Sequence, residues 1–134
     1  MRILLAEDHP MNRAIMEVIL SGISPELTLV EDGAQAVETF RRQDFDIVLM
    51  DIQMPVMDGL TAIREIRRYE VEGARFPTPI LAVTANALAK DAAACLEAGA
   101  DMHIPKPVDP ERLLTTIVAT VARHALTAEQ AVAC

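Results

Sequence analysis

The chain has 134 residues, of which 51% are apolar, and a formal net charge of −8. This length and apolar content fit one domain with its own core, and the negative charge argues against binding to nucleic acid or anionic membranes, which normally needs a basic face. The apolar runs are too short to span a bilayer, and Glu7 and Asp8 interrupt the first of them, which argues against a signal peptide and predicts a cytoplasmic location. Cys95 and Cys134 fit no disulfide or zinc pattern.

Five short apolar runs predict five buried strands, near residues 2–6, 27–30, 46–50, 79–83 and 101–104. Continuous apolar runs of this length, separated by helical patterns, are typical of parallel strands in βα units. The sequence therefore predicts an α/β domain in which helices connect parallel strands.

The first three helices are predicted from their start signals and apolar spacing. The first begins at Pro10, ends before Gly22, and carries an apolar stripe of Met11, Ile15, Val18 and Ile19. The second begins after Asp32-Gly33, and its inward residues are Ala34, Val37 and Phe40. The third begins at Gly59, and its apolar residues are Leu60, Ile63 and Ile66.

The last two helices differ in how much apolar surface they carry. The fourth, from about residue 86 to 98, is mostly alanine, and Gly99 is its expected C-terminal glycine. The fifth begins with Asp109 as N-cap and Pro110 in its first turn, and is expected to bury Leu114, Ile117, Val118 and Val121. Residues 124–134 either prolong this helix or form a tail.

Four of the predicted strands are followed by residues whose side chains can take part in phosphoryl transfer. In an open α/β sheet, ligands bind outside the carboxyl ends of the strands, where the strand order reverses. Glu7 and Asp8 follow the first strand, and two adjacent acids favour a hard cation such as Mg²⁺ between them. The alternative is that Asp8 caps the helix that begins at Pro10.

Asp51, Thr84 and Lys106 follow the third, fourth and fifth predicted strands. A carboxylate can attack phosphorus and form an acyl phosphate, while a hydroxyl and an ammonium can bind phosphoryl oxygens. Lys106 is one of only two lysines and lies between Pro105 and Pro107. The alternatives are an Asp that caps its own turn and a surface lysine in a proline turn.

These motifs resemble the receiver domain of two-component response regulators over about residues 1–123. The segments that carry the resemblance are ILLAEDHPMN, FDIVLMDIQMPVMDGL, PILAVTANA and IPKP, and DIQMPVMDG is most similar to receivers attached to or partnered with hybrid histidine kinases. The resemblance implies a flavodoxin-like (βα)5 fold, with a parallel five-stranded sheet in the order 2-1-3-4-5 and helices on both faces.

The resemblance also implies the role of each site residue. Asp51 is the expected phosphoacceptor, and the expected Mg²⁺ ligands are the side chains of Glu7, Asp8 and Asp51 and the backbone carbonyl of Gln53. Thr84 is the expected switch hydroxyl, and Lys106 is expected to bind the phosphate and to precede a cis proline. His103 stands where the family usually has Tyr or Phe, so a polar imidazole replaces the aromatic switch residue. The alternative for His103 is an exposed histidine at the end of a strand.

The function that the resemblance implies is phosphoryl transfer from a phosphohistidine, on a histidine kinase or a histidine phosphotransfer protein, to Asp51. Thr84 then moves inward, and the fourth helix, fifth strand and fifth helix change their binding of a downstream protein. Gln53 and Asn86 are expected to tune hydrolysis of the aspartyl phosphate, and no enzyme activity is expected beyond autocatalytic phosphotransfer and dephosphorylation.

Two other functions stay open at this point. A Mg²⁺-dependent phosphohydrolase of the haloacid-dehalogenase type needs an acid two residues after the nucleophile, where this chain has Gln53. The other is an interaction module that keeps the receiver fold but is not phosphorylated. The presence of all the acids, Thr84 and Lys106 argues against it, because such a module would not need them.

Overall fold

The computed structural model describes the backbone of residues 1–23, 25–85 and 89–133, and the side chains in these ranges up to residue 127 except those of residues 89 and 90. Five strands form one parallel sheet: β1 (Arg2–Ala6), β2 (Glu26–Val30), β3 (Ile47–Asp51), β4 (Ile80–Thr84) and β5 (Met102–Pro105). Their order is β2-β1-β3-β4-β5, which confirms the predicted flavodoxin-like topology.

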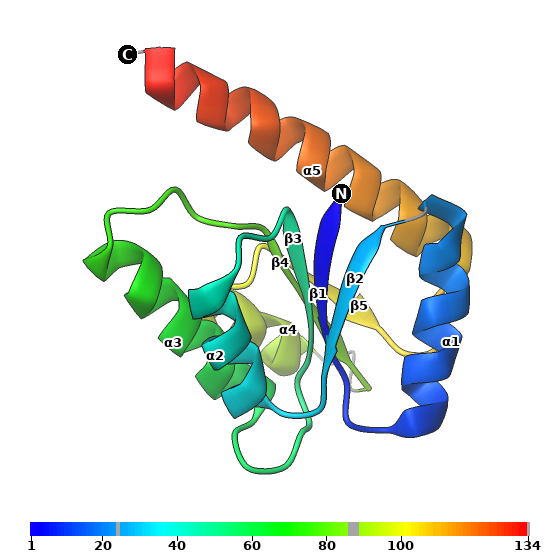
Figure 1. The fold of residues 1–134 in the computed structure, drawn as a ribbon. Helices are drawn as coiled ribbons and strands as arrows, with labels where there is room; N and C mark the ends of the chain where they lie inside the picture. Colours follow the sequence, from blue (N-terminus) through cyan, green and yellow to red (C-terminus); the bar gives the residue numbers. More distant parts are fainter. Residues whose placement is uncertain (24, 86–88, 134) are drawn as a thin grey trace.

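Helices connect successive strands and cover both faces of the sheet (Figure 1). They are α1 (Pro10–Leu20), followed by a short 3-10 turn (Ser21–Ile23), α2 (Gly33–Arg42), α3 (Gly59–Glu72), α4 (Ala89–Ala98) and α5 (Pro110–Ala133). Residues of α2, α3 and α4 share one apolar cluster, and residues of α1 and α5 share the other. The fold is therefore a sandwich of three layers. Among the residues that the structure describes, no helix combines the length and apolar character needed to cross a bilayer.

The central strands are buried on both faces because their side chains alternate between the two apolar clusters. In β1, Leu4 packs with α2 and α3, whereas Ile3 and Leu5 pack with α1 and α5. Alternation is the normal result of the two-residue period of a strand, and a helix layer on each face makes every position apolar. This arrangement explains the continuous apolar runs in the sequence.

The predicted apolar stripe of α1 was wrong in three of its four positions. Ile19 is buried, together with Met16 and Leu20, but Met11, Ile15 and Val18 are 67%, 51% and 73% exposed. The helix has two apolar sides, and only the side that carries Met16, Ile19 and Leu20 faces the sheet.

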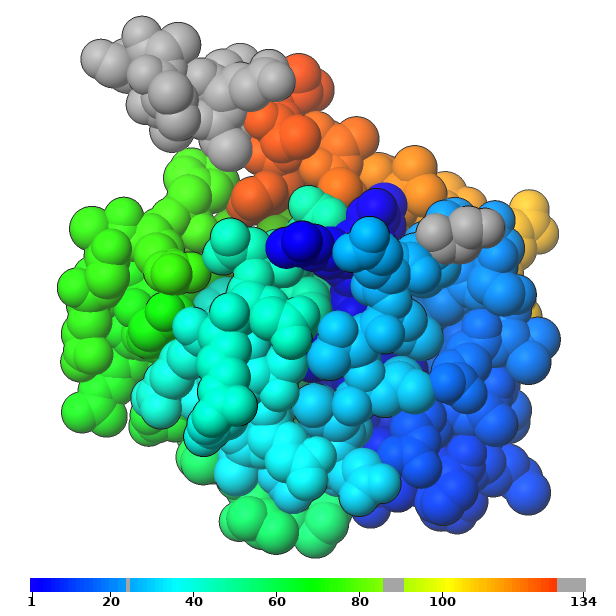
Figure 2. Space-filling model, in the orientation of Figure 1, coloured from blue at the N-terminus to red at the C-terminus, as the bar shows by residue number. Residues whose placement is uncertain are grey.

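The buried side of α5 also differs from the prediction. Leu113 and Ile117 are fully buried, Leu114 and Val121 are partly buried, and Val118 is exposed. The helix continues to Ala133 and crosses the amino-terminal edge of the sheet (Figure 1). There the His124 ring packs against Phe76 with ring centroids 5.0 Å apart, so the part of α5 around His124 borders the loop before β4 (Figure 2).

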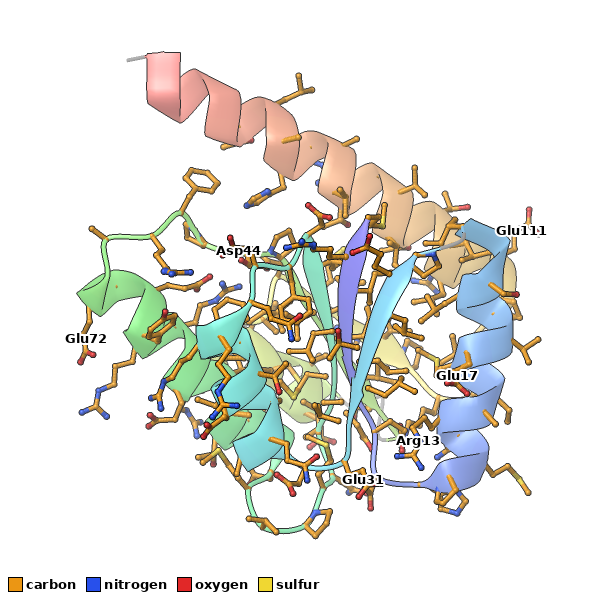
Figure 3. All side chains as sticks on the ribbon, in the orientation of Figure 1. Arg13, Glu17, Glu31, Asp44, Glu72 and Glu111 are labelled. Carbon is orange, nitrogen blue, oxygen red and sulfur yellow. The ribbon has the colours of Figure 1, made fainter. Side chains whose placement is uncertain are left out.

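Acidic side chains are distributed over the surface. The exposed Glu72 on α3 and Glu111 on α5 lie at opposite edges of the molecule (Figure 3). Arg13 on α1 pairs with Glu31, which follows β2, at 3.2 Å. These three acids therefore come from separate parts of the fold.

Candidate functional site

The strand order brings the predicted site residues to one edge of the sheet. β1 and β3 are central neighbours, and the order reverses between them because β2 lies beyond β1 and β4 lies beyond β3. Glu7 follows β1, Asp51 is the last residue of β3, Thr84 is the last residue of β4, and Lys106 follows β5. All four therefore lie at the carboxyl edge, at the point where ligands bind in open α/β sheets.

Three carboxylates converge at this edge. One oxygen each from Glu7, Asp8 and Asp51 can be chosen so that all three lie within 4.8 Å of one another. The side chains of Glu7 and Asp51 are buried, with residue exposures of 3% and 5%, and Asp8 lies nearer the surface. Carboxylate oxygens at this spacing suit a hard divalent cation, whose charge would offset their mutual repulsion.

Lys106 supplies the positive charge that faces this cluster. Its Nζ lies 3.3 Å from Glu7 Oε2 and 3.4 Å from Asp51 Oδ1. The Lys106–Pro107 peptide bond is cis, which confirms that expectation. One ammonium cannot neutralise three carboxylates, so the ionised site carries a net negative charge that would attract a further cation.

Asp51 is strongly affected by its surroundings. Burial, and then the charge of Glu7, raise the pKa of Asp51 from its ordinary value of 3.8 to about 6. The charge of Lys106 and the backbone N–H of Gln53, which donates to Asp51 Oδ1 at 3.3 Å, act in the opposite direction. An added cation would favour the ionised carboxylate, which is the nucleophilic form.

Thr84 and Lys106 come from neighbouring strands that are joined beside the site. Thr84 is buried and lies opposite Pro105 in the parallel register of β4 and β5. The backbone N–H of Lys106 donates to the carbonyl of Thr84 at 2.8 Å. Through this backbone hydrogen bond, a shift of Thr84 would act directly on the segment that carries Lys106.

The remaining predicted site residues have different positions. Gln53 is exposed on the loop after β3, and its carbonyl as a metal ligand stays a prediction. His103 is half-buried on β5, opposite Ala82, and lines a cavity of about 90 Å³ with Asp109 and Arg112. Its role in switching stays a prediction. Asn86 lies outside the described residues.

The loop of residues 52–58 is attached to two helices, which sequence reasoning missed. The N–H of Gly33 on α2 donates to the Met57 carbonyl at 3.0 Å, and that of Gly59 on α3 donates to the Ile52 carbonyl at 2.9 Å. A Cβ atom on Gly59 would lie only 2.2 Å from the backbone oxygen of Asp51. Glycine is therefore required where α3 meets the end of β3, and the DG pairs of both helices are the signal in the sequence.

A cavity of about 150 Å³ lies beside Asp51 and Lys106. Its walls include Asn12, Ile15 and Met16 of α1, and Pro107 and Val108 of the loop after β5. None of these five was predicted as a site residue. Of these five residues, only Ile15 belongs to the exposed apolar side of α1, because Met16 faces the sheet and Asn12 is polar.

The fold and this site are those of a flavodoxin-like receiver domain, and comparison with known proteins agrees. The sequence matches the family model described as response regulator receiver domain over residues 3–118, and the chain belongs to this family. It is 38% identical over 117 residues to the sensor protein GacS of Pseudomonas syringae, and 35% identical over 123 residues to the sensor histidine kinase RcsC of Salmonella typhi.

The matches to these two relatives cover 87% and 92% of this chain but only 13% and 12% of the relatives. The chain thus spans about an eighth of the length of these curated proteins. It is similar to the receiver domains of hybrid histidine kinases, which act in two-component and phosphorelay signalling.

Two solved structures are informative for the site. The receiver domain of the sensor histidine kinase PA1611 of Pseudomonas aeruginosa, with a magnesium ion in its active-site cleft, is 42% identical, has a TM-score of 0.81, and is matched over 90% of this chain and 97% of that one. The receiver domain of Ssk1 of Saccharomyces cerevisiae, solved in complex with the histidine phosphotransfer protein Ypd1, is 29% identical with a TM-score of 0.82, over 87% and 86% of the two chains.

Proposed function

We propose that Asp51 accepts a phosphoryl group from a phosphohistidine, and that the phosphorylated domain changes its binding of a downstream protein. The observation that carries this proposal is the convergence of a buried Asp51 with Glu7, Asp8 and the Lys106 ammonium at the carboxyl edge of the sheet. The magnesium ion in the PA1611 receiver supports the same use of the site.

The transfer forms one bond and breaks another. A carboxylate oxygen of Asp51 attacks phosphorus, the P–N bond of the phosphohistidine breaks, and its electron pair returns to the imidazole nitrogen, which takes up a proton. Lys106 lies where it can stabilise the phosphoryl oxygens of the transition state and the product. Glu7, Asp8 and Asp51 would hold Mg²⁺, with the backbone carbonyl of Gln53 as a further ligand, and the ion would supply positive charge to the transferring group.

The donor that this site suits is a histidine phosphotransfer protein or the phosphohistidine domain of a kinase. A donor must cover the rim of the site to bring its phosphohistidine to Asp51, and α1 forms that rim with the exposed apolar side chains of Met11, Ile15 and Val18. Ile15 also lines the cavity beside Asp51, so the apolar surface is continuous with the site. Burial of these side chains would contribute to docking. The Ypd1–Ssk1 complex supports this class of partner.

The signal would leave the site through Thr84. An acyl phosphate on Asp51 offers acceptor oxygens to the Thr84 hydroxyl, and the backbone bond between Thr84 and Lys106 links β4 to β5. We propose that this change alters the surface of α4, β5 and α5, with His103 within it, and so the affinity for the downstream protein. Such couplings are typically worth about 1–3 kcal/mol.

Turnover of an external phosphate ester is not part of this proposal. Gln53 is exposed at the position where a phosphohydrolase of this chemistry needs an acid. The aspartyl phosphate would instead hydrolyse with water, at a rate that Gln53 and Asn86 are proposed to tune.

The experiment that tests phosphorylation is intact-mass measurement after incubation with acetyl phosphate and Mg²⁺. We expect one phosphoryl adduct that is absent from Asp51→Asn and absent when a chelator removes Mg²⁺. Asp44→Asn is the matched control, because Asp44 is exposed and its one ion pair among the described residues is with Arg75, at 3.4 Å. Unphosphorylated wild-type protein under all of these conditions would support the interaction module instead.

A further inference from the structure

Glu70 is a buried acid that the phosphorylation site does not use. It lies on α3 and is only 2% exposed, and among the described residues only Glu7 and Asp51 are other carboxylates with such low exposure. Its Oε1 accepts from Arg67 Nη1 at 2.7 Å, and its Oε2 accepts from the backbone N–H of Thr78 at 2.6 Å. A buried charge is costly unless it is paired and hydrogen-bonded, so these bonds must hold for the fold to tolerate Glu70.

The partner of Glu70, Arg67, joins four parts of the chain. Besides Glu70 on its own helix, its guanidinium donates to the Thr78 carbonyl before β4 at 2.8 Å, to the carbonyl of Gly99 just after α4 at 2.8 Å, and to Oδ2 of Asp101 just before β5 at 2.9 Å. Asp101 Oδ2 also accepts from the N–H of Ile80, the first residue of β4, at 2.8 Å. We call Arg67, Glu70 and Asp101 the Arg67 cluster.

This cluster holds the carboxyl end of α4. The helix ends in a Schellman motif, in which the Gly99 N–H bonds to Leu96 and the Ala100 N–H bonds to Cys95, with Gly99 at a φ of +117°. A Cβ atom at Gly99 would lie 2.7 Å from Arg67 Cγ, so the arginine packs directly over the helix end. This end is therefore held by three kinds of contact: the cap, the arginine bond and packing.

The burial of α4 is concentrated at the same end. Cys95 and Ala98 are buried, whereas the described side chains of residues 91–94 are partly or fully exposed. Alanine is the main residue in that part, so it offers little apolar area for packing. The described part of α4 is thus attached to the domain chiefly through its last turn.

The Arg67 cluster lies at the opposite edge of the sheet from Asp51. It contacts β4 at Ile80, while Thr84 at the other end of the strand belongs to the site. These two residues are four positions apart along β4, a distance of about 13 Å. The fixed end of α4 and the phosphorylation site are therefore at the two ends of the same strand.

We propose that the Arg67 cluster is a pivot: on phosphorylation α4 turns about its carboxyl end, and its movement grows toward the end that lies near Thr84. The proposal rests on the function proposed above. Arg67 acts here as a positioning residue, because it fixes one end of α4 without contact with the site. Loss of Arg67 would let the whole helix move and would remove the graded response.

The test is residue-resolved NMR of the full chain, with beryllofluoride and Mg²⁺ as the phosphoryl analogue. In the wild type we expect amide chemical-shift changes that are large for residues 91–94 and several-fold smaller for residues 98–101. In Arg67→Met we expect several-fold faster hydrogen exchange at residues 95–100 before the analogue is added, and similar shift changes along all of α4 after it. Arg68→Met is the matched control, because Arg68 is exposed on the same helix and, within the part of the chain that the structure describes, forms ion pairs only with Glu65 and Glu72.

Failure of the pivot and failure of the proposed function look different. If the amides around Asp51 do not respond to the analogue, the proposed function fails and the pivot fails with it. If they respond but residues 98–101 shift as much as residues 91–94 in the wild type, the pivot alone is overturned, and this result does not depend on whether Arg67→Met folds. An unchanged gradient in Arg67→Met would also overturn it.

Discussion

Lys106 Nζ lies 3.4 Å from Asp51 Oδ1, although Asp51 ends β3, Lys106 follows β5, and β4 lies between these two strands in the sheet. The same ammonium lies 3.3 Å from Glu7 Oε2. A single cation thus serves two buried carboxylates, and the consequences for phosphorylation, stability and pH can be measured separately.

Replacement of Lys106 by Ala should slow phosphorylation of Asp51. The substitution removes the charge that stabilises the phosphoryl oxygens, and loss of one such electrostatic partner typically costs about 100-fold or more in rate. The measurement is the rate of adduct formation with acetyl phosphate at saturating Mg²⁺. Lys106→Arg retains the charge and should lose much less, and equal rates for wild type and Lys106→Ala would remove Lys106 from the mechanism.

Asp51→Asn should stabilise the protein at neutral pH when Mg²⁺ is absent. Because the pKa of Asp51 is raised to about 6 in the folded state, the ionised carboxylate destabilises the fold above that pH. The expected gain in unfolding free energy is about 1–3 kcal/mol at pH 7, from urea denaturation.

The pH dependence of this effect has a definite sign. Between the ordinary pKa of 3.8 and about 6, the folded state binds more protons than the unfolded state, so the unfolding free energy of the wild type falls as pH rises through this window. The advantage of Asp51→Asn should therefore shrink as pH falls toward 4. Mg²⁺ should stabilise the wild type more than the variant. If Asp51→Asn and the wild type differed in unfolding free energy by the same amount at pH 4 and pH 7, the raised pKa of Asp51 would be contradicted.

Substitution of Val18 by Asp should weaken transfer from a histidine phosphotransfer protein. Val18 is highly exposed on the apolar outer side of α1, and a charge there would oppose burial against a partner. The expected result is a weaker apparent affinity for the protein donor with little change in labelling by acetyl phosphate, because Val18 does not line the cavity beside Asp51. Glu17→Gln on the same helix is the control, and equal losses with both donors would indicate a folding defect instead of a docking surface.

Asp58→Ala should destabilise the fold by about 1 kcal/mol, as is usual for loss of an N-cap. The Asp58 side chain accepts from the Thr61 N–H at 2.8 Å at the start of α3, and this hydrogen bond lowers the pKa of Asp58 below its ordinary value. Because its pKa is lowered in the folded state, the ionised Asp58 stabilises the fold at neutral pH, and this stabilisation is lost as the pH falls below about 4. Denaturation experiments at pH 7 and at low pH should show that the difference in unfolding free energy between the wild type and Asp58→Ala becomes smaller as the pH falls. An undiminished difference at low pH would mean that the cap does not depend on the charge.

The order of elements and the site could be predicted because both are encoded locally. Each strand is a continuous apolar run, and each site residue stands at the end of one, so the parallel arrangement alone brings Asp51, Thr84 and Lys106 to one edge. The exposed side of α1 could not be predicted. Met11 and Val18 are as apolar as Met16 and Ile19, and periodicity alone does not say which apolar side faces the sheet.

The Arg67 cluster could not be predicted for a related reason. In the sequence, Arg67 and Glu70 have the spacing of an ordinary surface pair on a helix. Only the fold brings Gly99 and Asp101 to the guanidinium and buries Glu70. The raised pKa of Asp51 also depends on burial, which local sequence does not give.

The most direct test of the account is transfer of labelled phosphate from a phosphorylated histidine phosphotransfer protein to the purified chain in the presence of Mg²⁺. We predict that label leaves the donor histidine and appears on wild type and Asp44→Asn as an alkali-labile acyl phosphate, and that Asp51→Asn takes up none. Phosphorylation of Asp51 is contradicted if the wild type, folded and with Mg²⁺ bound, takes up no label from any phosphohistidine donor, or if Asp51→Asn is labelled as fully as the wild type.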